Sequence, residues 1–179
     1  MRNGIQLLFC CVILFSLLSC QLNNTSDVDS RQVLLDSIQT MEADLHSDIE
    51  VDAKKGQKMI AMYLNFSNRY RKDSLSPEYL FRAAEIAMNT DKPIDACSYL
   101  YQIERQYENF DKLAGVYYLL GFVNQNMIGD LENAEAYYQK FLERYPNHSR
   151  AEEVKTILQN LYIDDLELVR QFERQNAED

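Results

Sequence analysis

Few side chains in this sequence combine the type and the spacing that chemistry requires. His46 has Glu42 four residues before it and Glu50 four residues after it, so on one helix face the three could hold a metal ion weakly. Metal sites need converging and usually buried groups, and a charged helix face in solvent is the simpler interpretation. His148, the second of two histidines, lies in a loop next to Ser149. The sequence therefore predicts no metal site and no cofactor.

The usual patterns of catalytic nucleophiles and phosphate-binding loops are also missing. Cys97 stands beside Ala96 in a helical pattern with no histidine near it in sequence, which is typical of a small buried apolar residue. The 28 acidic residues leave open a pair of carboxylates that hydrolyses glycosides, but nothing singles out two of them. We therefore expect no catalytic residue and no enzymatic activity.

Cys20 is the residue for which the sequence indicates a covalent modification. The apolar stretch before it, residues 5–18, has 14 residues, a length typical of a secretory signal and too short to span a membrane. The stretch ends in a tetrapeptide that resembles the lipobox of bacterial lipoproteins, Leu17-Leu18-Ser19-Cys20. The resemblance implies cleavage before Cys20 and a diacylglycerol thioether on its sulfur. An ordinary signal peptide, or an uncleaved anchor in which Cys20 is incidental, is the alternative.

The lipobox resemblance also predicts a location. It implies a protein held by acyl chains, palmitate among them, on a membrane of the cell envelope. Gln21 follows the cysteine, where aspartate would retain an enterobacterial lipoprotein in the inner membrane. The resemblance thus favours the outer membrane, facing the periplasm, if the source is Gram-negative. We divide the chain into a signal peptide (1–19), a polar flexible tether (20–28) and a helical repeat domain (29–179).

The charge of the chain limits the partners that it can bind. The formal net charge is −10, and an acidic surface gains nothing from neutralising phosphates. This argues against nucleic acid and against adhesion to anionic lipid headgroups. A basic patch on a partner would suit the charge, although acidity is also a common means of solubility. We expect another protein or peptide as partner, and contact with the membrane only through the lipid on Cys20.

A short apolar pattern occurs three times, with spacings of four, three and four residues. The copies start 37 and then 38 residues apart. Repetition at a fixed period of about 20–50 residues is typical of stacked-repeat proteins, which offer extended binding surfaces. The three copies are Met59-Tyr63-Phe66-Tyr70, Ala96-Leu100-Ile103-Tyr107 and Ala134-Tyr138-Phe141-Tyr145.

Start and stop signals divide the repeat domain into helices alone. The start signals are Ser76 as N-cap before Pro77, Asp130 as N-cap after the break at Gly129, and a capping box formed by Ser149 and Glu152. Short connections predict antiparallel neighbours. We expect helices over about 29–47, 52–71, 77–89, 93–107, 112–127, 131–144, 150–161 and 166–172.

At this point the pattern resembles the tetratricopeptide repeat, a helical hairpin of about 34 residues with small residues where the two helices cross. Gly121 and Ala134 take the small positions of the third copy if one residue is inserted in the turn over 126–129. Ala84 and Ala96 take them in the second copy with no insertion. The first copy is degenerate, because Met59 replaces the small residue. The resemblance implies an all-α, tetratricopeptide-like solenoid of helical hairpins, with about three repeats and a C-terminal capping helix.

The tetratricopeptide resemblance also assigns an inner surface to the first helix of each hairpin. Tyrosine and phenylalanine are favoured as interface anchors, and Tyr118 is the aromatic residue of this register that we expect to contact a partner. Core burial is the alternative for any one of these residues. The expected protein-binding groove comprises Glu78, Phe81, Glu85, Met88, Asn89, Tyr118, Phe122, Gln125 and Asn126.

Lipobox and repeat together predict a membrane-anchored interaction scaffold or adaptor. Residues 141–146 are similar to repeats of envelope lipoproteins, among them the lipoprotein subunit of the outer-membrane β-barrel assembly machine. That similarity implies a role in envelope or outer-membrane protein assembly. The alternatives are an architectural, self-associating spacer lipoprotein and a carboxylate-dependent envelope hydrolase.

The lipid anchor gives a direct prediction. Changing Cys20→Ser removes the sulfur that the thioether needs, so palmitate labelling should be lost and the protein should leave the detergent phase. Metabolic labelling and phase partitioning measure the two effects. Labelling that persists in this variant would refute the lipobox interpretation.

Overall fold

The protein is all-helical throughout the part that the structure, a computed structural model, describes: residues 30–44, 53–163, 167 and 174. This confirms the predicted fold class. No strand occurs in these ranges, and none of the described helices is long and apolar enough to cross a membrane. Cys20, His46, Glu50, the tether and most of the helix expected over 166–172 lie outside the described residues.

The chain separates into two compact units, and the first holds one described helix over residues 30–44. Leu35 and Ile38 are the buried residues of this helix. The second unit contains α2 (Ala53–Arg69), α3 (Leu75–Asn89), α4 (Pro93–Gln106), α5 (Leu113–Val123), the π-helix η1 (Asn124–Ile128), α6 (Leu131–Arg144) and α7 (Ala151–Asn160).

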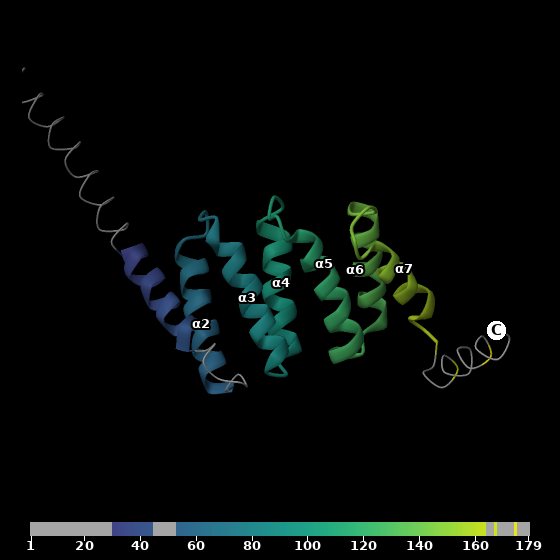
Figure 1. The fold of residues 1–179 in the computed structure, drawn as a ribbon, viewed down its shortest axis with the longest axis horizontal. Coiled ribbons are helices and arrows are strands. Elements are labelled where there is room, and N and C mark those ends of the chain that lie inside the picture. The colour runs from purple at the N-terminus through teal and green to yellow at the C-terminus, as the bar shows by residue number, and fades with distance from the viewer. Residues whose placement is uncertain (1–29, 45–52, 164–166, 168–173, 175–179) are drawn as a thin grey trace, which may run out of the picture. The chain divides into compact units, whose positions relative to one another are not determined.

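Within the second unit each helix packs on the next one along the chain, as Figure 1 shows for α2 to α7. Helices α3 and α4 form one antiparallel hairpin, and α5 with η1 and α6 form another. Helix α2 packs on α3, and α7 packs on α6. This neighbour-to-neighbour packing is that of a stacked-repeat protein, in which each unit buries the apolar face of the preceding one.

The repeated apolar pattern forms the core of the second unit. Its first three positions in each copy are all buried, and most of them are fully excluded from solvent. The last tyrosine of each copy is half-buried at the end of its helix. Each fully buried side chain of this size contributes about 1.5–3 kcal/mol through removal of its surface from water. The buried positions are Met59, Tyr63, Phe66, Ala96, Leu100, Ile103, Ala134, Tyr138 and Phe141.

Gly121 sets the distance between α5 and α6. A Cβ atom built on Gly121 would lie 2.5 Å from Cε1 of Tyr138, so the ring occupies the place of a side chain. The Tyr138 hydroxyl then donates to Oε1 of Gln125 at 2.9 Å. Only glycine permits this approach of a fully buried ring to the helix backbone.

The tetratricopeptide register required one inserted residue before Ala134, and the structure accommodates that residue within the helix that continues α5. The spacing from Gly121 to Ala134 is one residue longer than from Ala84 to Ala96, and the end of the longer helix is the π-helix η1. A π-helix accommodates one extra residue without changing the direction of the chain. Its end at Gly129, with φ of +80°, and the N-cap at Asp130 confirm the predicted break.

Two predicted caps are wrong, because nearby groups satisfy the backbone in other ways. Helix α3 begins at Leu75, whose N–H donates to Oδ1 of Asp73, while the hydroxyl of Ser76 lies inside the first turn and donates to the Tyr70 carbonyl. Helix α7 begins without a side-chain cap from Ser149. There Nδ1 of His148 accepts from the N–H of Arg150 instead.

Two glycines of α5 provide a matched stability test. Gly121→Ala forces a Cβ into the Tyr138 ring and should lower the free energy of unfolding by about 1–3 kcal/mol. Gly115→Ala places its Cβ 3.6 Å from Phe81, an ordinary contact, and should raise it by up to about 1 kcal/mol through helix propensity. Urea unfolding measures both changes, and equal effects would contradict the assigned close approach.

Candidate functional site

The predicted groove residues lie on the first helices of the two hairpins and on the π-helix that continues the second. We call these nine residues the first-helix face. Five are on α3, two on α5 and two on η1. Phe81 is buried, Glu85, Asn89 and Asn126 are exposed, and the others are half-buried. The nine positions are Glu78, Phe81, Glu85, Met88, Asn89, Tyr118, Phe122, Gln125 and Asn126.

The first residue of the first-helix face, Glu78, lies in an ion-pair network. Lys112, just before α5, contacts both carboxylate oxygens of Glu78 at 2.8 and 2.9 Å, and Arg82 donates to the same carboxylate at 3.0 Å. Burial raises the pKa of Glu78, but the hydrogen bonds from Lys112 and Arg82 outweigh it, and the pKa lies below its usual range. Glu78 is therefore an internal ion-pair partner at neutral pH.

The same lysine covers the buried aromatic ring of α3. Nζ of Lys112 lies 5.5 Å from the centroid of the Phe81 ring, and the Phe110 ring lies 6.2 Å from it. Phe81 thus joins α3 to the chain that enters α5, which explains its burial. Its role in the structure is packing between successive hairpins.

The middle of the first-helix face, formed by Glu85, Met88 and Asn89, is partly accessible to solvent. Glu85 makes no ion pair with another described residue, and partial burial raises its pKa, an effect that the positive charge of Lys112 offsets only in part. Met88 is half-buried and Asn89 is exposed at the end of α3. This stretch of α3 offers a carboxylate, a thioether and an amide within one helical turn.

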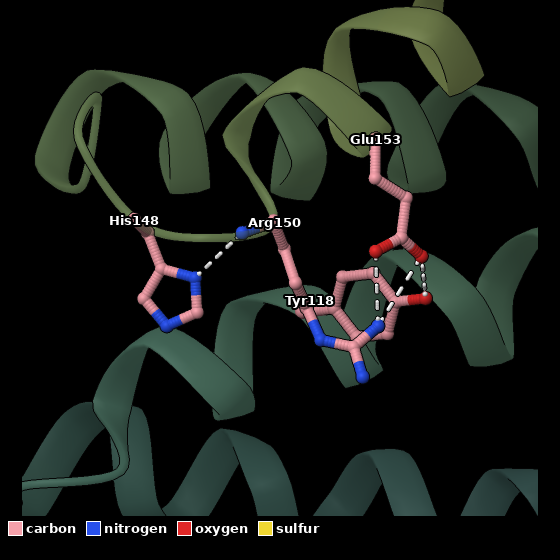
Figure 2. Close-up of polar contacts among 4 residues, drawn as sticks. All are labelled: Tyr118, His148, Arg150 and Glu153. Carbon is pink, nitrogen blue, oxygen red and sulfur yellow. Dashed lines mark hydrogen bonds and ion pairs between the residues drawn. The ribbon is translucent and has the colours of Figure 1, made fainter.

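Tyr118 is held by α7, as Figure 2 shows. Its hydroxyl donates to Oε1 of Glu153 at 2.8 Å, and the guanidinium carbon of Arg150 lies 4.6 Å from its ring centroid. Nη1 of Arg150 also contacts both oxygens of Glu153, at 3.1 and 3.2 Å. Burial, and then the hydrogen bond to Glu153, raise the pKa of Tyr118, so the phenol remains a donor. These contacts join α5 to the helix that caps the stack.

The contacts of Phe81 and Tyr118 are two copies of one arrangement. Phe81 and Tyr118 are 37 residues apart, and the covering cations Lys112 and Arg150 are 38 apart. Each cation is the N-cap residue of the next first helix. The sequence-based prediction named neither cation nor Glu153, and at the start of this helix it considered only a capping box of Ser149 and Glu152. The sequence feature that could have identified the two cations is the recurrence of an aromatic residue and a cation at the repeat period.

The end of the face lies on α5 and η1. Phe122 is half-buried, and Asn126 donates to its carbonyl oxygen at 3.0 Å. Oε1 of Gln125 accepts a hydrogen bond from the Tyr138 hydroxyl, and the side-chain N–H groups of Gln125 take no part in that contact. Phe122 and Met88 are therefore the large apolar side chains of the face that retain exposed surface together with neighbouring amides.

The described ranges contain no group of three histidine, cysteine or acidic side chains that could hold a metal ion. Cys97 is buried, and burial raises the pKa of its thiol to about 11. Its sulfur lies 3.9 Å from Nδ2 of the buried Asn124. A thiol of this pKa is protonated at neutral pH, so Cys97 is a packing residue, as predicted.

Comparison with protein families identifies a tetratricopeptide repeat at residues 116–148. The matched segment begins in α5 and passes through η1 and α6 to the loop before α7. It contains the third copy of the apolar pattern, the copy with Gly121, Ala134 and Pro146. Comparison with curated proteins found no match. Tetratricopeptide repeats are protein–protein interaction modules, so the match supports a protein-binding role for the segment that it covers.

The contact of Tyr118 with Glu153 should be measurable as a coupling. In a double-mutant cycle of Tyr118→Phe and Glu153→Met, we expect a coupling of about 0.5–1 kcal/mol in the free energy of unfolding, because each change alone removes the hydrogen bond between the two side chains. Urea denaturation provides the measurement. The exposed pair Lys155 and Glu152, cycled with Lys155→Met and Glu152→Gln, should give a coupling near zero. A coupling of Tyr118 with Glu153 no larger than that of this control pair would contradict the docking role.

Proposed function

We propose that this protein is a lipid-anchored scaffold of the bacterial cell envelope, which binds a segment of another envelope protein on its first-helix face. The single observation that carries the proposal is the tetratricopeptide repeat at residues 116–148, the part of the chain whose first helix carries Tyr118, Phe122 and Gln125. The similarity of residues 141–146 to envelope lipoproteins supports a role in envelope or outer-membrane protein assembly.

The middle and end of the face have the composition of a peptide-binding surface. Met88 and Phe122 supply apolar contact area, and both are partly exposed. Asn89, Gln125 and Asn126 carry side-chain amides, which can donate to and accept from a peptide backbone. Apolar anchors surrounded by polar groups are the usual source of affinity at protein interfaces. The stacked hairpins hold these side chains on rigid helices.

The lipid anchor would determine where this binding takes place. One acyl chain gives only marginal membrane binding, whereas the two or three chains of a lipoprotein hold a protein stably on a bilayer. The lipobox-like sequence at Cys20 supports this part of the proposal, with the outer membrane as the location in a Gram-negative source. Residues 20–28 would then act as the tether.

The binding surface is tested by substitutions that spare the contacts between hairpins. Met88→Ser with Phe122→Ser removes the apolar anchors but leaves Tyr118, Phe81 and their cations in place. We expect these changes to abolish the envelope cross-links that a photo-crosslinking residue at position 126 forms in living cells. Mass spectrometry of the cross-linked products measures the loss.

The matched control changes half-buried side chains on second helices, with Met62→Ser and Tyr99→Ala. This variant should retain the cross-links, and circular dichroism should show both variants folded. Unchanged cross-linking of the folded Met88→Ser and Phe122→Ser variant would exclude the first-helix face as the binding surface.

A further inference from the structure

A hollow of about 790 Å³ lies beside two of the turns that join one hairpin to the next. One wall is the turn between α2 and α3, and the other is the turn between α4 and α5. The start of α3 lies between these walls. The volume falls in the range of about 300–1,000 Å³ that is usual for ligand sites. Apart from Glu78, none of the residues that line the hollow belongs to the first-helix face.

The two walls carry charges of opposite sign that do not pair with each other. Arg71 and Lys72 line the hollow from the first turn, and Glu108 and Asp111 line it from the second. All four are exposed, and none makes an ion pair or a hydrogen bond with another described residue. The two other carboxylates of the lining are already engaged: Lys112 and Arg82 pair with Glu78, and Oδ1 of Asp73 accepts from the N–H of Leu75.

The space between the charged walls is bordered by apolar groups. Leu75, Pro77, Tyr107 and Phe110 contribute to the lining. The hydroxyl oxygen of Tyr107 is buried and takes part in no hydrogen bond of ordinary geometry.

We propose that this hollow binds a polypeptide segment of a partner protein that carries a basic side chain, an apolar side chain and an acidic side chain close together. The basic group pairs with Glu108 and Asp111, the acidic group pairs with Arg71 and Lys72, and the apolar group rests on Pro77 and Phe110. This inference depends on the proposed scaffold function, and it adds a second contact surface at the turns between hairpins.

Charge and shape favour a polypeptide over other occupants. The acidic wall and the net charge of −10 repel nucleic acid and anionic lipid, which would meet only one of the two walls favourably. A polypeptide can present a basic, an apolar and an acidic side chain next to one another, as the two walls and the space between them require. Pairing at two walls of opposite sign also fixes the direction of the bound segment.

The test begins with peptides selected from a phage-displayed library of random dodecapeptides on the full chain, purified in detergent. We expect the selected sequences to combine basic, apolar and acidic residues. Fluorescence anisotropy then measures the affinity of each synthetic peptide for the protein. Glu108→Lys with Asp111→Lys, and separately Arg71→Glu with Lys72→Glu, should each weaken binding about tenfold, because one peptide charge then meets a like charge.

The matched control for Glu108→Lys with Asp111→Lys is Glu132→Lys with Glu143→Lys, which makes the same change in net charge at exposed positions of α6. It should leave the affinity within about twofold, since neither side chain lines the hollow. Circular dichroism of all variants establishes that they fold.

Other outcomes overturn the inference in distinguishable ways. The selected peptides could bind both hollow variants as tightly as the unaltered protein and lose affinity only for the Met88→Ser and Phe122→Ser variant. That result would refute the hollow and support the first-helix face. Peptides that carry charges of only one sign, or that respond equally to the α6 control, would also refute it. A library that yields no binding peptide would count against the hollow and the scaffold function together.

Discussion

The contact of Tyr138 with the backbone of α5 at Gly121 is the constraint on which the second hairpin depends. A ring that occupies the position of a missing side chain brings Tyr138 of α6 against the backbone of α5. At this distance Arg144 reaches the hydroxyl of Tyr117, and Gln125 reaches that of Tyr138. The close packing of the Tyr138 ring and the polar contacts at its edge thus depend on one residue without a Cβ atom.

Between successive first helices, cations and aromatic rings add a further kind of contact to the apolar packing. Lys112 over Phe81 and Arg150 over Tyr118 repeat one arrangement, in which a cation at the start of a first helix covers the aromatic residue of the preceding one. Each cation also pairs with a carboxylate, Glu78 or Glu153. Apolar packing thus builds each hairpin, and cations help to stack one hairpin on the next.

Sequence reasoning predicted the helices well because turn residues such as Gly129 and Asp130 act locally. It failed where the tertiary structure supplied a competing partner: Ser76 bonds to the Tyr70 carbonyl, and His148 caps Arg150. The first-helix face followed from the repeat register, which fixes the side of the helix on which a residue lies. The register could not show that Tyr118 is already engaged, because that depends on side chains of the next helix. The hollow between the two turns could not be predicted either, because its walls are 32 or more residues apart in the sequence.

The π-helix at Asn124–Ile128 has a consequence for how such chains change in length during evolution. An added residue would rotate everything after it by about 100° if the α-helix simply continued. Here the wider turn absorbs the residue, and Asp130 still begins α6 so that Tyr138 lies against Gly121. The side-chain amide of Asn124 donates to the Leu120 carbonyl within this region. Length variation between repeats is thereby confined to a single helical turn, and neighbouring repeats keep their mutual geometry.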